Sequence, residues 1–169
     1  SMKNLHKEGD AFHWEAEFKT VPLRPPESEL LQAEKEVKEL LDRVMQLPTF
    51  KALAAGDDLV ELREFPSEEK PNRKGSLLVR PIGIPILLEA VTRALEKSDL
   101  DTIFKKLARF DREAGFEAYR PNSIFYMVTY DARNRRMDPK QAKVNLAEDL
   151  LAYLLVGGPS DRKSTRLNS

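Results

Sequence analysis

The predicted fold depends on one stretch, 76-SLLVRPIGIPILLEAVTRALEK-97. Residues 77–79 are all apolar, which suits a short buried, strand-like segment. Pro81 disfavours a helical conformation for the residue before it, so no helix begins earlier. Pro85 is tolerated only in a first helical turn, where its missing N–H would have no partner. We therefore expect an elbow followed by a helix that begins near Gly83 or Ile84.

The helix that follows the elbow has one apolar face. Its apolar residues recur every three or four positions, and Glu89, Arg93 and Glu96 fall between them. We expect this face to be buried against another part of the molecule. Its residues are Ile86, Leu87, Ala90, Val91, Ala94 and Leu95.

Two further helices are predicted on either side of this stretch. Residues 27–47 show the clearest helical period and predict a core helix of a bundle, with a coiled-coil partner helix as the alternative. Residues 98–110 begin with a capping box of Ser98 and Asp101. The expected buried faces are Leu30, Ala33, Val37, Leu40, Val44 and Leu47 in the first helix, and Leu100, Ile103, Phe104 and Leu107 in the second.

A last helix is predicted from Asp138 to about Val156. Asp138 is expected as its N-cap, Pro139 as its first residue and Gln141 at the third position. Gly157 and the residues after it end the helix. Its expected buried face consists of Ala142, Leu146, Leu150, Tyr153 and Leu154.

Two segments favour extended structure. Residues 11–21 alternate between apolar and polar side chains, which predicts a strand or an extended arm with one buried face. Residues 124–130, IFYMVTY, are β-branched and aromatic, and predict a short strand or a buried extended segment. The expected fold class is therefore mainly α: a helical, bundle-like single domain over residues 11–158 with a few short strands or extended segments.

The two ends of the sequence resemble additions to a natural protein. Ser1 before Met2 is similar to the residue left by tag cleavage. Residues 161–168, DRKSTRLN, resemble a sequencing adapter translated in frame, which indicates a metagenomic or assembled gene. We expect residues 1–10 and 159–169 to be disordered.

The composition excludes several kinds of site. Lys plus Arg and Asp plus Glu each number 28, so any attraction to nucleic acid must come from a local patch. The chain has no cysteine, which excludes disulfides and thiolate chemistry, and only two histidines. No apolar run approaches the ~20 residues of a membrane span. We expect a cytoplasmic protein with no membrane partner, no metal site and no cofactor.

No catalytic motif is present in the sequence. It contains no Gly-rich phosphate loop, no Gly-x-Ser-x-Gly elbow and no His-Glu-x-x-His. Carboxylate pairs, Asp57 with Asp58 and Glu68 with Glu69, lie in predicted polar loops. We therefore expect no enzyme and no catalytic residue. A hydrolase that uses paired carboxylates is left as an alternative.

One segment combines positive charge with aromatic rings. Lys and Arg beside aromatic rings can neutralise phosphates and stack on bases. Alternatively, the rings pack in the core while the arginines pair with carboxylates. The first part of the segment holds Tyr119, Arg120, Phe125, Tyr126 and Tyr130. The predicted nucleic-acid-binding residues are Arg133, Arg135, Arg136, Lys140 and Lys143.

Three motifs occur in a fixed order. They are residues 45–50, MQLPTF; residues 77–83, LLVRPIG, before a helix; and Arg136-Met137 followed by residues 145–147, NLA, and an apolar helix end. In this order and spacing they resemble the C-terminal half of DndB-like, DGQHR-domain proteins, which are associated with DNA phosphorothioation. The resemblance covers about residues 27–158. The namesake motif of that family, in a ParB-like N-terminal domain, is missing.

This resemblance implies a non-catalytic, DNA-associated accessory or regulatory domain. Members of the family are thought to act in DNA-modification and defence loci, some as DNA-binding transcriptional repressors. The implied partners are double-stranded DNA, other DNA-modification proteins or a second copy of the chain. The alternative is a protein-interaction module, in which the apolar faces of helices 27–47 and 81–97 dock a missing N-terminal domain or a second copy.

Overall fold

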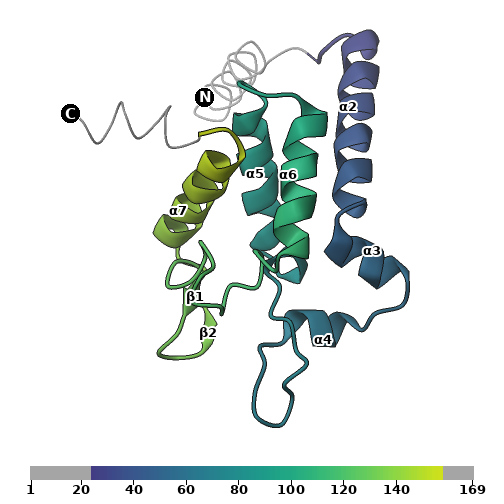
Figure 1. Ribbon diagram of the computed structural model, residues 1–169. Helices are drawn as coiled ribbons and strands as arrows, with labels where there is room; N and C mark the ends of the chain where they lie inside the picture. The colour runs from purple at the N-terminus through teal and green to yellow at the C-terminus, as the bar shows by residue number, and fades with distance from the viewer. Residues whose placement is uncertain (1–23, 158–169) are drawn as a thin grey trace, which may run out of the picture. The chain divides into compact units, whose positions relative to one another are not determined.

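The computed structural model describes residues 24–157, which are mainly helical with one small antiparallel sheet (Figure 1). This confirms the predicted fold class. In chain order the elements are α2 (Glu27–Met45), α3 (Pro48–Ala54), α4 (Leu59–Arg63), the 3₁₀ helix η1 (Leu77–Val79), α5 (Gly83–Ala94), α6 (Leu100–Arg112), β1 (Tyr130–Asp131), β2 (Arg136–Met137) and α7 (Gln141–Ala152).

Contacts divide the chain into two units, and the division falls between Leu40 and Leu41, inside α2. Residues 24–40 are described only as the start of that helix, and all packing reported below lies within residues 41–157. The predicted single domain over residues 11–158 stays a prediction. Three further predictions lie outside the described residues: the strand or arm at 11–21 and the disordered ends at 1–10 and 159–169.

The elbow before α5 is built on a buried 3₁₀ turn. Residues 77–79 form η1, so the strand-like conformation predicted for them is wrong. The reason is local: the hydroxyl of Ser76 accepts a hydrogen bond from the N–H of Leu78 at 3.3 Å and caps the turn. Leu77 and Leu78 are each 1% exposed, so their predicted burial is confirmed. The start of α5, predicted near Gly83 or Ile84, is also confirmed, at Gly83.

Gly83 lies directly against the backbone of η1. A Cβ atom at this position would lie 1.9 Å from the carbonyl oxygen of Leu77. No real side chain can approach an oxygen so closely, so only glycine lets the first turn of α5 pack on η1 in this way. The missing side chain therefore sets how sharply the elbow turns.

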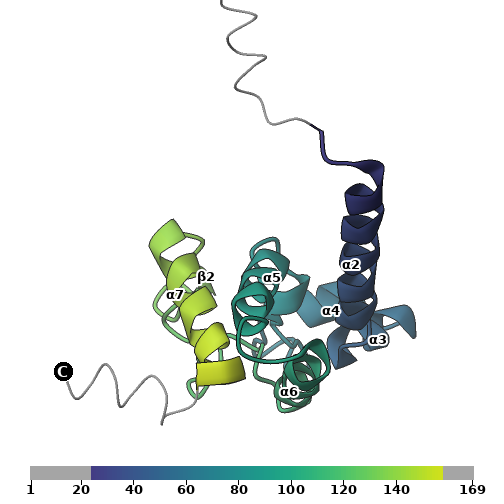
Figure 2. The same ribbon diagram turned by 90° about the horizontal axis from the view of Figure 1, so that it is seen from above.

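α5 is the centre of the core within residues 41–157. It packs on η1 and on α7, and Figure 2 shows α7 beside it. Its predicted face is buried, except that Leu95, just past the end of the helix, is 44% exposed. Burial of this apolar surface is the main favourable contribution to folding. The fully buried residues are Ile86, Leu87, Ala90, Val91 and Ala94.

Three phenylalanines join α6 to the loop that follows it. The ring of Phe110 meets that of Phe116 edge to face at 4.8 Å between centroids. Phe116 in turn stacks on Phe125 at 5.8 Å. Both Phe116 and Phe125 are buried, and such ring pairs add to the energy of burial. This cluster anchors the irregular chain that leads to β1.

The N-caps of α6 and α7 differ from the predictions. Asp99 caps α6 in place of Ser98, because its carboxylate accepts hydrogen bonds from the N–H and the hydroxyl of Thr102 at 2.8 and 3.0 Å. A charged acceptor stabilises the free N–H groups of a helix start more than a hydroxyl does. α7 begins at Gln141, so the predicted N-cap Asp138 lies before the helix.

The strand predicted at residues 124–130 is wrong. These residues form turns, and only Tyr130 belongs to a strand. Met127 has a φ of 60°, which breaks an extended chain. Residues of high strand propensity are here used for burial in irregular structure, since propensity for strands depends strongly on context.

α7 and the π-helical residues 153–157 that continue it bury a different face from the one predicted. Leu146 and Leu154, on the predicted face, are 43% and 40% exposed, whereas Leu151 and Leu155 are fully buried. The helix is apolar on two faces, and periodicity alone could not tell which of them meets α5. The buried residues are Ala147, Leu151, Ala152 and Leu155.

α2 buries its predicted core face only at the C-terminal end. Val44, and Leu47 just after the helix, are buried, Leu30 and Leu40 are half-buried, and Ala33 and Val37 are exposed. The prediction of a buried face therefore holds at this end of the helix and is wrong at Ala33 and Val37. A periodic pattern shows that a face is apolar, not that another element covers it.

Replacing Gly83 with alanine is expected to lower the free energy of unfolding by more than about 2 kcal/mol, because the new Cβ would overlap the Leu77 carbonyl oxygen. Urea unfolding followed by circular dichroism measures this change. The control is P85A, at an exposed position in the same turn, which should change stability by less than about 1 kcal/mol. An unchanged urea midpoint for G83A would contradict the packing.

Candidate nucleic-acid interface

The predicted basic segment forms a hairpin. β1 and β2 pair with Asp131 opposite Arg136. The carboxylate of Asp131 shapes the turn: it accepts hydrogen bonds from the side-chain amide of Asn134 at 2.6 Å and from the N–H of Arg133 at 3.0 Å. The bond from Asn134 is the main reason that the pKa of Asp131 is lowered. The turn therefore keeps a charged, locally bonded carboxylate at its base and points its arginines outward.

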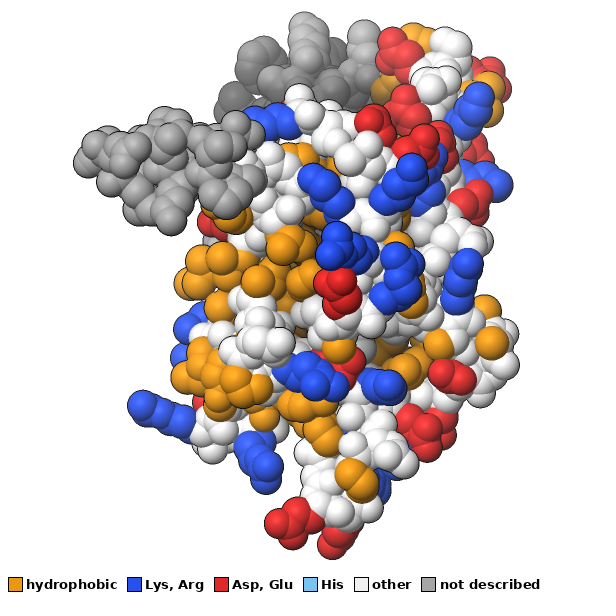
Figure 3. Space-filling model, viewed as in Figure 1, with side chains coloured by type: hydrophobic (Ala, Val, Ile, Leu, Met, Phe, Trp, Pro, Cys, Tyr) orange, Lys and Arg blue, Asp and Glu red, His pale blue; other side chains and the backbone are white. Residues whose placement is uncertain are grey.

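The hairpin and the elbow line one groove. Arg135 and Arg136 come from the hairpin, Arg80 from the elbow, and Lys70 from the loop before η1. The groove has a volume of about 510 Å³. Figure 3 shows Lys and Arg side chains projecting from this end of the molecule, at lower left. The remaining lining residues are Glu64, Phe65, Ser67, Glu69 and Met137.

Arg80 lies in this groove without a counter-ion. Its guanidinium is 4.3 Å from the centre of the Phe65 ring and donates a hydrogen bond to the carbonyl oxygen of Arg63. Its Nε is buried and has no hydrogen-bond partner. Burial, and then the charge of Arg63, lower the pKa of Arg80. A bound anion would compensate this charge.

The groove carries more positive than negative charge. Its two carboxylates belong to Glu64 and Glu69. The carboxylate of Glu64 already accepts a hydrogen bond from Nε of Arg73 at 3.0 Å. Nζ of Lys70 lies 3.6 Å from the same carboxylate. Within residues 24–157 the hairpin arginines have no carboxylate at ion-pair distance. A local excess of positive charge thus exists although the net charge of the chain is zero.

The other three predicted site residues lie in different surroundings. Arg133 is exposed at the hairpin turn, close in sequence to the groove arginines. Lys140 is exposed just before α7. Lys143 has a structural contact, since its ammonium donates a hydrogen bond to the carbonyl oxygen of Met127 at 3.3 Å. The structure therefore brings two of the five predicted residues together in one groove.

Two of the four aromatic residues of the segment, Phe125 and Tyr130, pack inside, whereas Tyr119 and Tyr126 are half-buried. Phe125 is fully buried and Tyr130 is 7% exposed. Arg120 pairs with Glu117 at 3.0 Å. For these residues the alternative is confirmed, in which rings fill the core and an arginine pairs with a carboxylate. The ring that does line the groove, Phe65, comes from outside the predicted segment.

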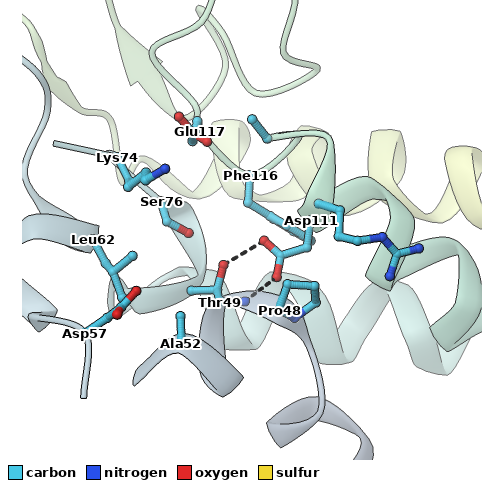
Figure 4. Close-up of a pocket in the computed structure, with 12 residues that line it drawn as sticks. Pro48, Thr49, Ala52, Asp57, Leu62, Lys74, Ser76, Asp111, Phe116 and Glu117 are labelled. Carbon is cyan, nitrogen blue, oxygen red and sulfur yellow. Dashed lines mark hydrogen bonds between the residues drawn. The ribbon is translucent and has the colours of Figure 1, made fainter. Parts of the chain in front are cut away.

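A second pocket, of about 240 Å³, lies where α3 meets the end of α6 (Figure 4). The residue before α3, Leu47, offers no capping side chain. Asp111 of α6 caps the helix instead: its carboxylate accepts hydrogen bonds from the N–H and the hydroxyl of Thr49 at 2.8 and 2.7 Å. Burial raises the pKa of Asp111, and the bonds from Thr49 oppose this shift.

This second pocket bears on the hydrolase alternative, because Asp57, Asp111 and Glu117 all line it. A general base needs a carboxylate oxygen within reach of a substrate proton. Both oxygens of Asp111 already accept hydrogen bonds from Thr49, and Oε1 of Glu117 accepts two from Arg120, at 3.1 and 3.0 Å. The pocket therefore has the character of a structural clasp that joins two helices.

Between residues 24 and 157, His, Cys, Asp and Glu side chains form no group of three or more that could hold a metal ion. None of the helices in this range is both long enough and apolar enough to cross a membrane.

Comparisons with known proteins found no match. No family model, no curated protein and no solved structure is significantly similar to this chain. The resemblance to DndB-like proteins therefore stays a prediction. The geometry and charge of the groove are the evidence for a function.

Sequence reasoning missed the groove residues outside the hairpin. Phe65 and Lys70 lie in segments without a periodic signal of apolar residues. Arg80 was considered only for its backbone conformation, as the residue before Pro81. One signal could have indicated Arg80: it follows a fully apolar run, residues 77–79, that was expected to be buried. A cation next to buried chain requires a compensating partner or ligand.

Replacing Asp111 with alanine is expected to lower the free energy of unfolding by about 1–3 kcal/mol, because Thr49 loses both acceptors and α3 loses its cap. T49A removes only the hydroxyl bond and should cost about 1 kcal/mol. Urea unfolding at neutral pH measures both changes. Equal stability of D111A and the wild type would show that the clasp contributes nothing.

The pH dependence of this clasp has a definite sign. Because the pKa of Asp111 is raised on folding, its contribution to stability is present at low pH and is lost as the pH rises through its folded-state pKa. D111N does not titrate at this position. The stability of the wild type relative to D111N should therefore fall as the pH rises above about 4, the ordinary pKa of an aspartate carboxyl. A relative stability that rises over this range would contradict the shift.

Proposed function

We propose that this chain binds the phosphate backbone of DNA in the groove between the hairpin and the elbow. One observation carries the proposal: Arg80, partly buried and without a counter-ion, lines the same groove as Arg135 and Arg136. Phosphate is a suitable ligand because guanidinium groups bind its oxygens through short, charge-assisted hydrogen bonds.

The shape of the hairpin supports DNA as the source of the phosphates. The major groove of B-DNA admits a two-stranded β-ribbon. The hairpin is such a ribbon, although a short one, and Arg133 extends its positive charge to the turn. The contacts proposed for the groove arginines go to phosphates and carry little sequence information, so we expect binding that tolerates many sequences.

The proposed role is accessory and non-catalytic. A groove with four cations and two carboxylates would bind DNA through charge, so affinity should fall as salt rises, with a slope set by the few phosphates contacted. Such a domain would hold a larger assembly on DNA. This agrees with the accessory or regulatory part in DNA modification that the family resemblance implies.

A protein-interaction module is the second candidate. Its support is the exposed apolar row on α2, where Leu31 and Val37 are 59% and 55% exposed. The other face offered for docking in the sequence analysis, that of α5, is buried inside the unit and is not open to a partner. The dependence of affinity on salt concentration distinguishes the two candidates. Apolar docking responds weakly to salt, whereas phosphate binding weakens steeply as salt rises.

The test is a fluorescence-anisotropy titration of a labelled random duplex with the full chain across a salt series. We expect the variant R133A/R135A/R136A to bind at least about tenfold more weakly, and the slope of log affinity against log salt to fall by roughly two or three. These three side chains form no ion pair within residues 24–157, so their loss should leave the fold intact, which circular dichroism checks.

The matched control is K51A/K97A/K105A, which removes the same number of positive charges from exposed positions away from the groove. It should bind nearly as well as the wild type. Equal weakening of both triple variants would mean that only overall charge matters. No binding of the wild-type chain at low salt would refute the DNA proposal.

A further inference from the structure

The groove has an aromatic wall as well as cations. The ring of Phe65 lines it together with Met137. Two tyrosines hold this ring, because its centroid lies 4.8 Å from that of Tyr130 and 6.3 Å from that of Tyr119. Gly75 packs against the ring as well, since a Cβ there would lie 2.7 Å from Cδ1 of Phe65. The ring is therefore a fixed part of the groove.

Arg80 lies over this ring and is held there. Its guanidinium carbon is 4.3 Å from the centre of the Phe65 ring, and the group donates a hydrogen bond to the carbonyl oxygen of Arg63. A guanidinium is planar and delocalised, so it stacks on aromatic rings. Phe65 covers one side of the group, and the half-buried Arg80 still lines the groove. The groove thus offers a ligand the uncovered side of a flat, fixed cation.

A flat cation of this kind suits a nucleobase. Bases stack on the planes of guanidinium groups as they do on aromatic rings. Inside a duplex each base is already stacked between its neighbours, so its faces are not available to a protein. An unpaired base has a free face. Stacking on Arg80 therefore distinguishes unpaired from paired nucleotides, which a purely electrostatic contact does not.

The charges of the groove set the direction in which a nucleotide lies. Arg135 and Arg136 are exposed and come from the hairpin, whereas both carboxylates come from residues 64–69. Nζ of Lys70 lies 3.6 Å from the carboxylate of Glu64, so this cation already has an anionic neighbour. A phosphate is therefore attracted to the hairpin side of the groove, which leaves the base on the side of the elbow.

The size of the groove agrees with a nucleotide. Its volume of about 510 Å³ falls within the range of about 300–1,000 Å³ that is typical of sites for small organic ligands. A duplex can lie across the mouth of such a groove but is too wide to enter it. A single nucleotide that leaves the duplex or ends a strand can enter.

We propose that the groove binds an unpaired nucleotide of a DNA strand, with its base stacked on the guanidinium of Arg80 and its phosphate on Arg135 and Arg136. This inference rests on the proposed function and specifies its ligand. The hairpin contacts the phosphate backbone, and the groove selects places where one strand is unpaired. Strand ends, gaps and opened segments of DNA provide such nucleotides.

The first experiment compares a labelled thymine strand of about 20 nucleotides with a blunt duplex of the same length. Both are titrated with the full chain at one salt concentration, and binding is followed by fluorescence anisotropy. Charge alone favours the duplex, in which the phosphates are denser. We expect the single strand to bind at least about threefold more tightly, because only its bases can stack. Equal or tighter binding of the duplex would overturn the inference.

The second experiment uses R80K, which keeps the positive charge but removes the planar group. It should weaken binding of the thymine strand at least about fivefold and binding of the duplex by less than about twofold. The matched control is R136K, the same change at an arginine proposed to contact only phosphate, and it should weaken both by the same factor. Circular dichroism checks that both variants fold. Equal weakening of strand and duplex by R80K would contradict stacking.

An abasic strand isolates the stacking, because it has the same sugars and phosphates but no bases. The wild type should bind it at least about fivefold more weakly than the thymine strand. R80K should change binding of the abasic strand by less than about twofold, since the partner of Arg80 is already missing. If R80K weakens both strands equally, Arg80 contacts phosphate and the inference is wrong.

Failure of this inference and failure of the proposed function give different results. If R133A/R135A/R136A weakens duplex binding while the single strand has no advantage, the proposed function stands and the site for an unpaired nucleotide does not. If the chain binds the thymine strand through Arg80 but no duplex at low salt, the reverse holds. If it binds neither, both are refuted.

Discussion

The close approach of Gly83 to the carbonyl oxygen of Leu77 is the constraint on which the rest of the described unit depends. It lets α5 start immediately after η1, so the apolar face of α5 meets η1 at one end and α7 along its length. The same elbow leaves Arg80 at the bend, where its guanidinium reaches the ring of Phe65 and the groove. One contact of backbone with backbone thus positions both the core and the groove.

The groove shows how a chain of zero net charge can offer a cationic surface. Its arginines come from segments more than fifty residues apart in the sequence, and the carboxylates near them are few or already bonded. The phenylalanine cluster around Phe116 anchors the loop that carries the hairpin to this place. Electrostatic character here belongs to the tertiary arrangement and not to the composition.

At the contact between α3 and α6, one helix supplies the N-cap of the other. Asp111 supplies the cap that the residue before α3 lacks, across 62 residues of chain. This satisfies the free N–H of Thr49 but places a carboxylate in a partly buried site, which raises its pKa. At Asp111 the hydrogen bonds to Thr49 stabilise the charged carboxylate, whereas its burial destabilises it. Asp99, which caps α6, is exposed and is not destabilised by burial in this way.

The sequence by itself determined the helical class, the start of α5 at Gly83 and its buried face, because proline, glycine and periodic apolar residues act locally. It also identified the basic hairpin segment. Only the tertiary structure decided which face of α7 is buried, that residues 124–130 turn, and that Arg80 joins the hairpin arginines. Each of these depends on contacts between residues distant in sequence, and local propensity contains no information about the partner that a face will meet.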